Sequence, residues 1–320
     1  QIVTIAVEYH RFMEIDHRKA TILKTIDEQG RMTDELKARI DKSWDLTELE
    51  DIYLPYKPHR KTRADVAREK GYEPLAEAIF AQKLPITQII QNSKIQNQHS
   101  EEALQGARDI SAEWINQDEQ ARNGVRREFS YSALLTTKVV KGKESEEEAQ
   151  KYRDYFAVKE PLKRITSHRL LAIRRAEAEG FIRVDISPDS EKALDKLARI
   201  FLKTNSDTTY QVELAMEDSY KRLLKPSIET EFAAQSKEKA DEEAIRVFAQ
   251  NLRQLLLESP LGQKRVLALD PGFRTGCKTV VLSAQGDLLH HTVVFVNNVA
   301  STKTLQQLIA QYQIEAIAIG

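Results

Sequence analysis

Residues 265–276 read RVLALDPGFRTG, and this stretch decides how the C-terminal part of the chain folds. Its VLAL run is short, apolar and followed by turn residues, which is typical of a central β-strand covered on both faces. Asp270 is therefore predicted at the carboxyl end of that strand. Because Pro271 and Gly272 do not continue a sheet comfortably, the chain is expected to turn there and to leave the Asp270 carboxylate at the sheet edge. Ligands bind at that edge in open α/β sheets.

The residues after this stretch predict the element order β-β-β-α-β. Extended, β-branched runs flank a Gly-containing turn, and a helical pattern then precedes another apolar run. Leu305, Leu308 and Ile309 fall on one face of that helix. The predicted elements are strands at 278–283, 288–296 and 314–319, a turn at 284–287, and a helix capped by Ser301 or Thr302 and ending at Tyr312.

A ribonuclease H-like domain begins with this order of elements. In such domains the Asp of the first strand helps to bind divalent metal for phosphodiester chemistry, which makes Asp270 a candidate catalytic residue. The alternative interpretation is that Asp270 only starts a turn, because Asp-Pro-Gly is ordinary turn chemistry. Asp287 lies in the predicted hairpin turn, away from that strand end, and is not a candidate companion.

Composition limits the class of protein. A length of 320 residues is long for one core, so two or more domains are expected, and 41% hydrophobic with 30% charged residues suits a soluble, helix-rich protein. The net charge of −1 argues against global attraction to nucleic acid and leaves local basic patches to consider. Cys277 is the single cysteine, which fits a reducing compartment, and we expect a cytoplasmic protein without a membrane span. Since the sequence starts without Met and stops directly after a predicted strand, we expect a fragment.

The remainder of the chain predicts mostly helices. A long first helix is expected to end at Gly30, and its apolar stripe is interpreted as core packing. Pro226 is expected to interrupt the helical pattern, and Pro260 with Gly262 to end it, which places the domain boundary near Leu261. Thr33 and Thr47 are predicted to cap two helices, which end at about Ser43 and near Pro55. Further helices are predicted at 74–82, 100–116, 118–138, 188–202, 211–225 and 228–258, with an exposed strand at 181–186.

The first basic segment is 53–70, YLPYKPHRKTRADVAREK. Two prolines and two tyrosines predict that its first half is an extended, ordered connection. Its cations either contact phosphates or clamp acidic helices within the fold. The candidate nucleic-acid-binding residues are Lys57, Arg60, Lys61 and Arg63.

The second basic segment is 163–175, KRITSHRLLAIRR, which contains no acidic residue. Ser167 is predicted to cap a helix that ends at Gly180 and places several cations along a groove of nucleic acid. His168 is interpreted as a packed or hydrogen-bonded residue rather than a metal ligand. The candidate nucleic-acid-binding residues are Lys163, Arg164, Arg169, Arg174 and Arg175.

Four stretches together resemble one family, the bacterial Tex transcription accessory proteins. They are LEDIYLPYKPHRKTRADVAREKGYEPLA at 49–76, KRITSHRLLAIRRAEAEG at 163–180, KADEEAIRVFAQNLRQLLL at 239–257 and ALDPGFRTGCK at 268–278. The resemblance extends from about residue 20 to the end. It implies a mainly α N-terminal region at 1–261, with a helix-turn-helix-like part at about 157–204, followed at 262–320 by the first half of an α/β ribonuclease H-like (YqgF) domain.

The resemblance also implies a function. Kinship with a eukaryotic transcription elongation factor points to a nucleic-acid-binding transcription scaffold without catalysis, whose partners are RNA or DNA and RNA polymerase or other transcription machinery. The family's S1 domain is not in this sequence, so weak binding is expected from this chain. No cofactor is expected, and Mg²⁺ belongs only to the first alternative, a metal-dependent nuclease or resolvase that uses Asp270. The second alternative is an actin-like binder of nucleotide phosphates at the Asp-x-Gly turn.

Overall fold

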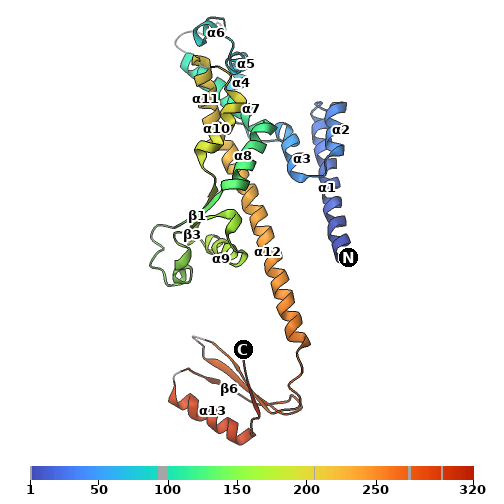
Figure 1. Ribbon diagram of the computed structural model, residues 1–320, viewed down its shortest axis with the longest axis vertical. Coiled ribbons are helices and arrows are strands. Elements are labelled where there is room, and N and C mark those ends of the chain that lie inside the picture. Colours follow the sequence, from blue (N-terminus) through green and yellow to red (C-terminus); the bar gives the residue numbers. More distant parts are fainter. Residues whose placement is uncertain (1, 93–99, 205, 273–274, 297) are drawn as a thin grey trace. The chain divides into compact units, whose positions relative to one another are not determined.

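Two compact units make up the chain in a computed structural model, and each is described here by itself (Figure 1). Helix α12 (Lys225–Leu257) continues across the division between them, so the domain boundary proposed near Leu261 remains a prediction. The units are Gln1–Arg246 and Val247–Gly320, and the structure describes residues 2–92, 100–204, 206–272, 275–296 and 298–320.

Three N-terminal helices form a small core of their own. Thr33 caps α2 as predicted, because its hydroxyl accepts a hydrogen bond from the Leu36 amide. The predicted cap of α3 is wrong: Asp45, not Thr47, lies at the N-cap, where its carboxylate accepts the free amides of the first turn. These helices are α1 (Ile2–Glu28), α2 (Asp34–Lys42) and α3 (Leu46–Tyr53), and their core contains Ile15, Ile22, Ile26, Ile40, Leu49, Ile52 and Tyr53.

Core packing explains only the second half of α1. Ile5, Tyr9 and Phe12 continue the helical spacing of the buried residues but are exposed. The prediction that the whole stripe is core is therefore wrong, because α2 and α3 cover α1 only where Ile15, Ile22 and Ile26 lie.

The larger core of the first unit is mostly helical and includes residues of two strands. Helix α7 packs tightly against α4 because Gly106 has no side chain: an added Cβ would lie 2.6 Å from Cδ2 of Tyr72 and 3.1 Å from Cβ of Ala67. The predicted polar stretch at 91–99 lies mostly outside the described residues. The helices are α4 (Arg63–Glu69), α5 (Glu73–Ala81), α6 (Ile86–Asn92), α7 (Ser100–Gln117), α8 (Glu119–Ser132), α10 (Ser190–Phe201) and α11 (Asp207–Ser219), and the 3₁₀ turn η1 (Leu54–Tyr56) precedes α4.

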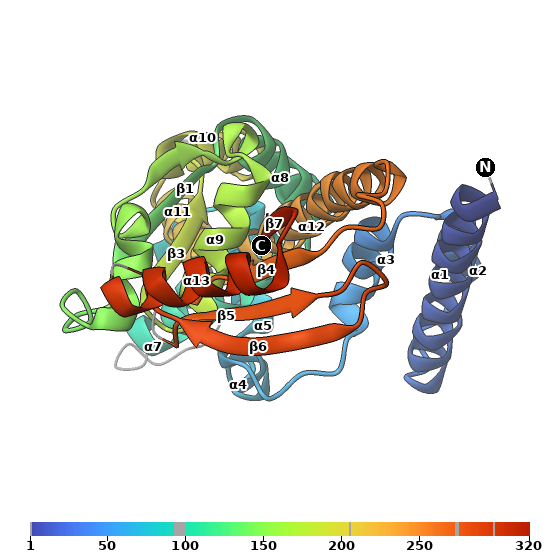
Figure 2. The ribbon, with the colours of Figure 1, turned by 90° about the horizontal axis from the view of Figure 1, so that it is seen from below.

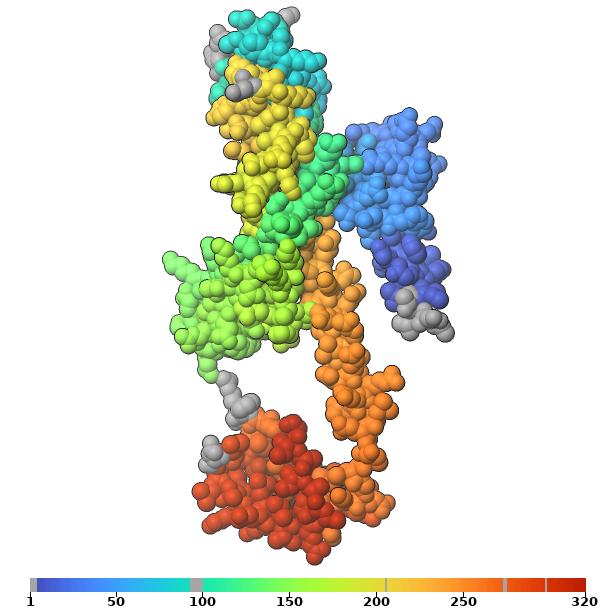
Figure 3. All heavy atoms as spheres, viewed as in Figure 1, coloured from blue at the N-terminus to red at the C-terminus, as the bar shows by residue number. Residues whose placement is uncertain are grey.

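A three-stranded antiparallel sheet with the order β2-β1-β3 belongs to the same unit (Figure 1), and its residues fall in the green to yellow-green part of the space-filling view (Figure 3). The helix predicted at 118–138 is wrong in its last part: α8 ends at Ser132, and β1 (Leu134–Val139) follows. In the predicted helix-turn-helix-like part, α9 (Ser167–Ala178) and α10 are joined by β3 (Ile182–Ser187) rather than by a short turn. The N-cap of α9 is Thr166 instead of Ser167. The other elements are the 3₁₀ helices η3 (Glu147–Tyr155) and η4 (Leu162–Arg164) and strand β2 (Lys159–Pro161).

Pro226 does not interrupt the helical chain, which corrects the prediction. A π-helical turn, Tyr220–Leu224, connects α11 to α12, so that Pro226 falls in the first turn of α12. The Lys225 amide donates to the Tyr220 carbonyl five residues earlier, so the helical chain continues through the π turn up to Pro226. The wider π turn absorbs the change of hydrogen-bond register that the missing amide of Pro226 imposes.

The second unit contains the predicted β-β-β-α-β order. Strand β4 pairs antiparallel with β5 and parallel with β7, in the sheet order β6-β5-β4-β7. Helix α13 lies on one face of the sheet, where Leu308 packs with Leu267 and Val281 (Figures 1 and 2). The elements are β4 (Val266–Asp270), β5 (Cys277–Leu282), β6 (Leu288–Val294), α13 (Val299–Tyr312) and β7 (Ala316–Ile319).

Two details of this unit differ from expectation. Asn298, not Ser301 or Thr302, caps α13; the Ser301 hydroxyl instead accepts from the Phe295 amide. Strand β4 is not covered on both faces, since Leu267 is its only fully buried residue among the residues described. The mainly α first unit and the mixed sheet of the second nevertheless agree with the expected fold class.

Candidate functional site

Asp270 lies where the sequence predicts it, at the carboxyl end of β4, and it is exposed. Because β4 and β7 run parallel, both strands end at the same edge of the sheet. The Gly320 amide donates to the Leu269 carbonyl at 2.9 Å, and a Cβ added at Gly320 would lie 3.9 Å from Oδ1 of Asp270. The carboxylate thus projects at the edge where ligands bind in open sheets.

The two glycines after Asp270 are required by close backbone packing. A Cβ at Gly272 would lie 2.5 Å from the carbonyl oxygen of Gly276. Gly276 has a φ of +79°, and a Cβ there would lie 2.7 Å from Cγ1 of Val293. The turn therefore closes tightly after the strand. Phe273 and Arg274, between these two glycines, lie outside the described residues.

Among the residues described, Asp270 does not belong to any group of three potential metal-ligating side chains. The residue opposite it on β5 is Lys278. Asp287 lies in the β5–β6 turn, beyond Leu282, which is opposite the first residue of β4. Since metal-dependent phosphodiester cleavage uses several converging carboxylates, the described donor set does not fit a catalytic Mg²⁺ site.

A different group, His59, Asp65 and Glu113, places three potential metal-ligating atoms within 4.8 Å of one another. Arg68 already pairs with Asp65 at 3.2 Å and with Glu113 at 2.5 Å. The hydrogen bond from the Thr62 amide, with the nearby positive charges, lowers the pKa of Asp65. We interpret this group as a brace between α4 and α7, because Arg68 supplies the cation that the carboxylates require.

The first basic segment divides into paired and unpaired cations. Lys57 lies 3.9 Å from Glu50, and Lys61 lies 2.5 Å from Glu69. Arg60 and Arg63 are exposed, and their side chains form no hydrogen bond or ion pair with any described residue. Within this segment, Arg60 and Arg63 are thus the candidates free to contact a ligand.

The second basic segment divides in the same way. Arg169 pairs with Glu160 at 2.9 Å and lies over the Tyr155 ring, and Arg174 pairs with Glu177 at 2.7 Å.

Lys163 donates to the Tyr131 carbonyl at 3.0 Å. The exposed side chains of Arg164 and Arg175 form no such contact in the part of the chain that is described. His168 is exposed, and its Nε2 lies 3.4 Å from the Thr166 hydroxyl. No hydrogen bond or ion pair between described residues joins the two basic segments.

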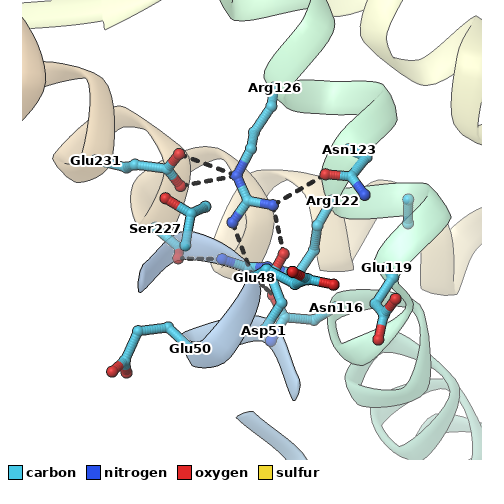
Figure 4. Close-up of polar contacts among 12 residues, drawn as sticks. Glu48, Glu50, Asp51, Asn116, Glu119, Arg122, Asn123, Arg126, Ser227 and Glu231 are labelled. Carbon is cyan, nitrogen blue, oxygen red and sulfur yellow. Dashed lines mark hydrogen bonds and ion pairs between the residues drawn. The ribbon is translucent and has the colours of Figure 1, made fainter. Parts of the chain in front are cut away.

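The most buried ionic group was not predicted from the sequence (Figure 4). Asp51 of α3 binds Arg122 of α8 at 2.6 Å and also binds Arg126, which in turn holds Glu231 of α12 at 2.9 Å. Arg122 and Arg126 are four residues apart, the spacing that places two side chains on one helix face, and this was the only signal in the sequence.

The charges of this network are tightly balanced. Burial alone would raise the pKa of Asp51, but the hydrogen bonds and charges of Arg126 and Arg122 outweigh it and hold that pKa below its usual range. The Asp51 side chain is only 6% exposed. The network therefore joins three helices, and its cations and carboxylates are occupied with one another.

Comparison with known proteins matches parts of both units to models of one family. Residues 83–248 match the family model described as Tex central region-like, and residues 264–320 match the Tex protein YqgF-like domain. The chain is 38% identical to the uncharacterized protein YdcI of Bacillus subtilis and 35% identical to the transcriptional accessory protein Tex of Neisseria gonorrhoeae; all of the chain aligns with 46% and 43% of those proteins. It is 26% identical to the human S1 RNA-binding domain-containing protein 1, with 93% of the chain covering 32% of that protein.

The chain therefore spans less than half the length of the curated relatives it matches. No helix in the described ranges has the length and apolar character needed to cross a membrane.

Proposed function

The chain belongs to the Tex family, and from that premise we propose that it is a nucleic-acid-binding scaffold that assists transcription and performs no catalysis itself. The observation that carries this proposal is the succession of a Tex central region and a Tex YqgF-like domain along one chain. The names of relatives support it: one is called a transcriptional accessory protein and another contains an S1 RNA-binding domain.

Exposed arginines support the nucleic-acid part of the proposal. Arg60, Arg63, Arg164 and Arg175 carry charges that no described carboxylate neutralises by an ion pair. Guanidinium groups of this kind bind phosphate oxygens, and each contact releases counterions from the nucleic acid. The proposed ligand is RNA or DNA bound weakly by this chain, and RNA polymerase is the proposed protein partner.

The salt dependence of oligonucleotide binding tests the proposed scaffold function. We would measure fluorescence anisotropy of labelled single-stranded RNA, single-stranded DNA and duplex DNA with the wild-type chain and with Arg60, Arg63, Arg164 and Arg175 all changed to Gln. The four-residue variant should bind more weakly on every oligonucleotide and with a smaller salt dependence.

In the matched control, four other exposed cations are changed to Gln, so that the net charge falls by the same amount as in the arginine variant. They are Lys42, Lys83, Lys203 and Lys221, which form no ion pair with any described residue. Wild-type protein that binds no oligonucleotide at low salt would refute the scaffold. Equal losses in the variant and its control would refute the assignment to these arginines.

The position of Asp270 favours one second candidate, a metal-dependent nuclease. It requires carboxylates outside the described donor set, and its test is cleavage of branched or single-stranded nucleic acid with Mg²⁺ or Mn²⁺. Cleavage by the wild-type protein that is absent in Asp270→Asn, at equal folded fraction, would replace the scaffold with the nuclease. Saturable ATP binding would instead favour the nucleotide binder.

A further inference from the structure

The outer face of the sheet β2-β1-β3 carries three cations from three strands. Thr136 of β1 is opposite Lys159 of β2, and Lys138 of β1 is opposite Arg183 of β3. Directly opposite residues of antiparallel strands point to the same side, and residues two apart on one strand do so as well. Lys138, Lys159 and Arg183 therefore share one face, and all three are exposed.

The other face of this sheet belongs to the core. Leu135, Ile182 and Ile186 are buried there. Glu160 also points to that side, where it pairs with Arg169 of α9. Since α9 lies on the inner face, the three cations of the outer face are directed away from it.

The outer-face cations differ from the paired cations of this chain. Lys138 and Arg183 lie directly opposite each other, and like charges in that position destabilise a sheet. Neither they nor Lys159 form an ion pair or side-chain hydrogen bond with any described residue. Arg122 and Arg126, by contrast, are matched by Asp51 and Glu231. The sheet thus holds a repulsive pair that has no ion-pair partner among the described residues.

One carboxylate, that of Asp185, lies on the same face, and it is already engaged. Lys225 lies 3.1 Å from it, and the Ser187 hydroxyl donates to it at 2.6 Å. Burial would raise the pKa of Asp185, but these hydrogen bonds and the charges of Lys225 and Lys138 hold it below its usual range. Asp185 therefore stays ionised and forms its ion pair with Lys225 rather than with one of the three outer-face cations.

The shape of this surface favours a polyanion over a small ligand. Three strands span about 10 Å between the outer two, and the cations lie on the flat pleat. No aromatic side chain on these strands is present to stack on a base, so the face suits backbone contacts without base readout. We propose that the outer face of this sheet, through Lys138, Lys159 and Arg183, binds the phosphate backbone of nucleic acid. This inference rests on the proposed function and adds a surface to it.

The test is the salt dependence of binding in a triple variant. We would change Lys138, Lys159 and Arg183 to Gln in this chain and titrate labelled duplex DNA and single-stranded RNA. Three lost contacts should reduce the slope of log K against log salt by about 2–3 on both ligands. The control changes Lys42, Lys83 and Lys203 to Gln and should leave the slope nearly unchanged.

A single charge reversal separates binding from folding. Arg183→Glu should weaken binding while raising the melting temperature, because Glu would pair with Lys138 instead of repelling it, and Lys138 would keep its attraction for Asp185. A lower melting temperature would overturn the assignment of Lys138 and Arg183 as a repulsive pair.

The outcomes distinguish failure of this binding surface from failure of the proposed function. If the wild-type chain binds nucleic acid and the triple variant binds equally well with the same salt slope, the outer face of the sheet is not the binding surface, but the proposed scaffold function is unaffected. If the wild-type chain binds no nucleic acid, the proposed function fails. If polyglutamate of matched charge competes as well as nucleic acid, the face binds acidic protein segments and the assignment to nucleic acid is wrong.

Discussion

Asp51→Asn is the most informative single substitution for stability. The carboxylate of Asp51 is shared by two arginines of α8, and it connects the N-terminal helices to the larger core of the first unit. Asn has nearly the same shape but no charge, and its amide nitrogen would face guanidinium donors. The substitution therefore removes the charge without leaving a cavity.

The size of the effect follows from what each arginine retains. Arg126 keeps Glu231, but Arg122 keeps only neutral acceptors, Ser227 at 3.2 Å and Asn116 at 3.5 Å. Removing one partner of a buried ion pair costs about 3–5 kcal/mol. Because one of the two arginines remains paired, we expect a loss near the lower end, about 3 kcal/mol.

Low pH should reproduce the substitution in the wild-type protein. The pKa of Asp51 is depressed in the folded state, so its contribution is fully present above the unfolded value of about 3.9 and is lost as pH falls through the folded value. The difference in stability between wild type and Asp51→Asn should be constant near pH 7 and shrink below pH about 4.

Trp44 provides a local assay, because it packs against Phe12 and lies under the Lys19 ammonium at 3.7 Å. In a Trp114→Phe background Trp44 is the only tryptophan, and its fluorescence during urea unfolding reports the N-terminal helices. The control is Asp154→Asn, an exposed carboxylate with no ion pair to any described residue, which should change stability by less than about 0.5 kcal/mol. A loss below about 1 kcal/mol for Asp51→Asn would refute the reasoning.

Three further predictions concern packing and the basic helix. Gly106→Ala should lower the free energy of unfolding, measured with urea, by about 1–2 kcal/mol, because the new Cβ would meet Tyr72. Gly124→Ala should raise it by about 0.5–1 kcal/mol, because the nearest atom to its Cβ is Ile200 Cδ1 at 4.0 Å. A change of the same sign in both variants would contradict this prediction. Gly276→Ala should cost about 2–4 kcal/mol from its positive φ and the contact with Val293, seen as faster amide exchange in β5 and β6; unchanged exchange would contradict it. The double variant Arg169→Gln, Arg174→Gln should lower the free energy of unfolding by about 1 kcal/mol, because both arginines are ion-paired. It should weaken oligonucleotide binding less than the double variant Arg164→Gln, Arg175→Gln does. A larger loss of affinity in the first variant would show that the paired arginines bind phosphate.

The sequence predicted the second unit well because its signals are local. Alternation, a Gly turn and one helical face specify β-β-β-α-β without information from distant residues. The cap of α13 was wrong because Asn298, Ser301 and Thr302 are all good caps, and the choice depends on where the strand before them ends. The helix itself was predicted correctly, but its N-cap residue was not.

The end of α8 was mispredicted for a different reason. After Ser132 the apolar residues still fit a helical stripe, although the Leu-Leu-Thr-Thr-Lys-Val run has the composition of a strand. Pairing with β3, almost fifty residues later, decides in favour of the strand. Tertiary pairing of this kind overrides local preference and is not visible in a single segment.

In the candidate sites too, local patterns predicted where residues lie but not which residues they contact. The place of Asp270 followed from the strand and the turn beside it, but the partners of each cation did not follow from any local pattern. Arg169 and Arg174 belong to the most basic stretch of the chain and are nevertheless paired, with Glu160 and Glu177. Lys138 and Arg183 lie far apart in the sequence and become neighbours only through the register of β1 and β3.

A net charge of −1 is compatible with nucleic-acid binding because charge acts locally. At physiological salt the screening length is about 8 Å, so a phosphate responds to the few side chains next to it and not to the total. Ion pairs within the fold remove cations and acids in equal number and leave the net charge unchanged, but they determine which cations remain available. Where unpaired cations gather, as on the outer face of the sheet, the local charge is positive although the chain is neutral. Binding at such a face must therefore fall steeply with salt.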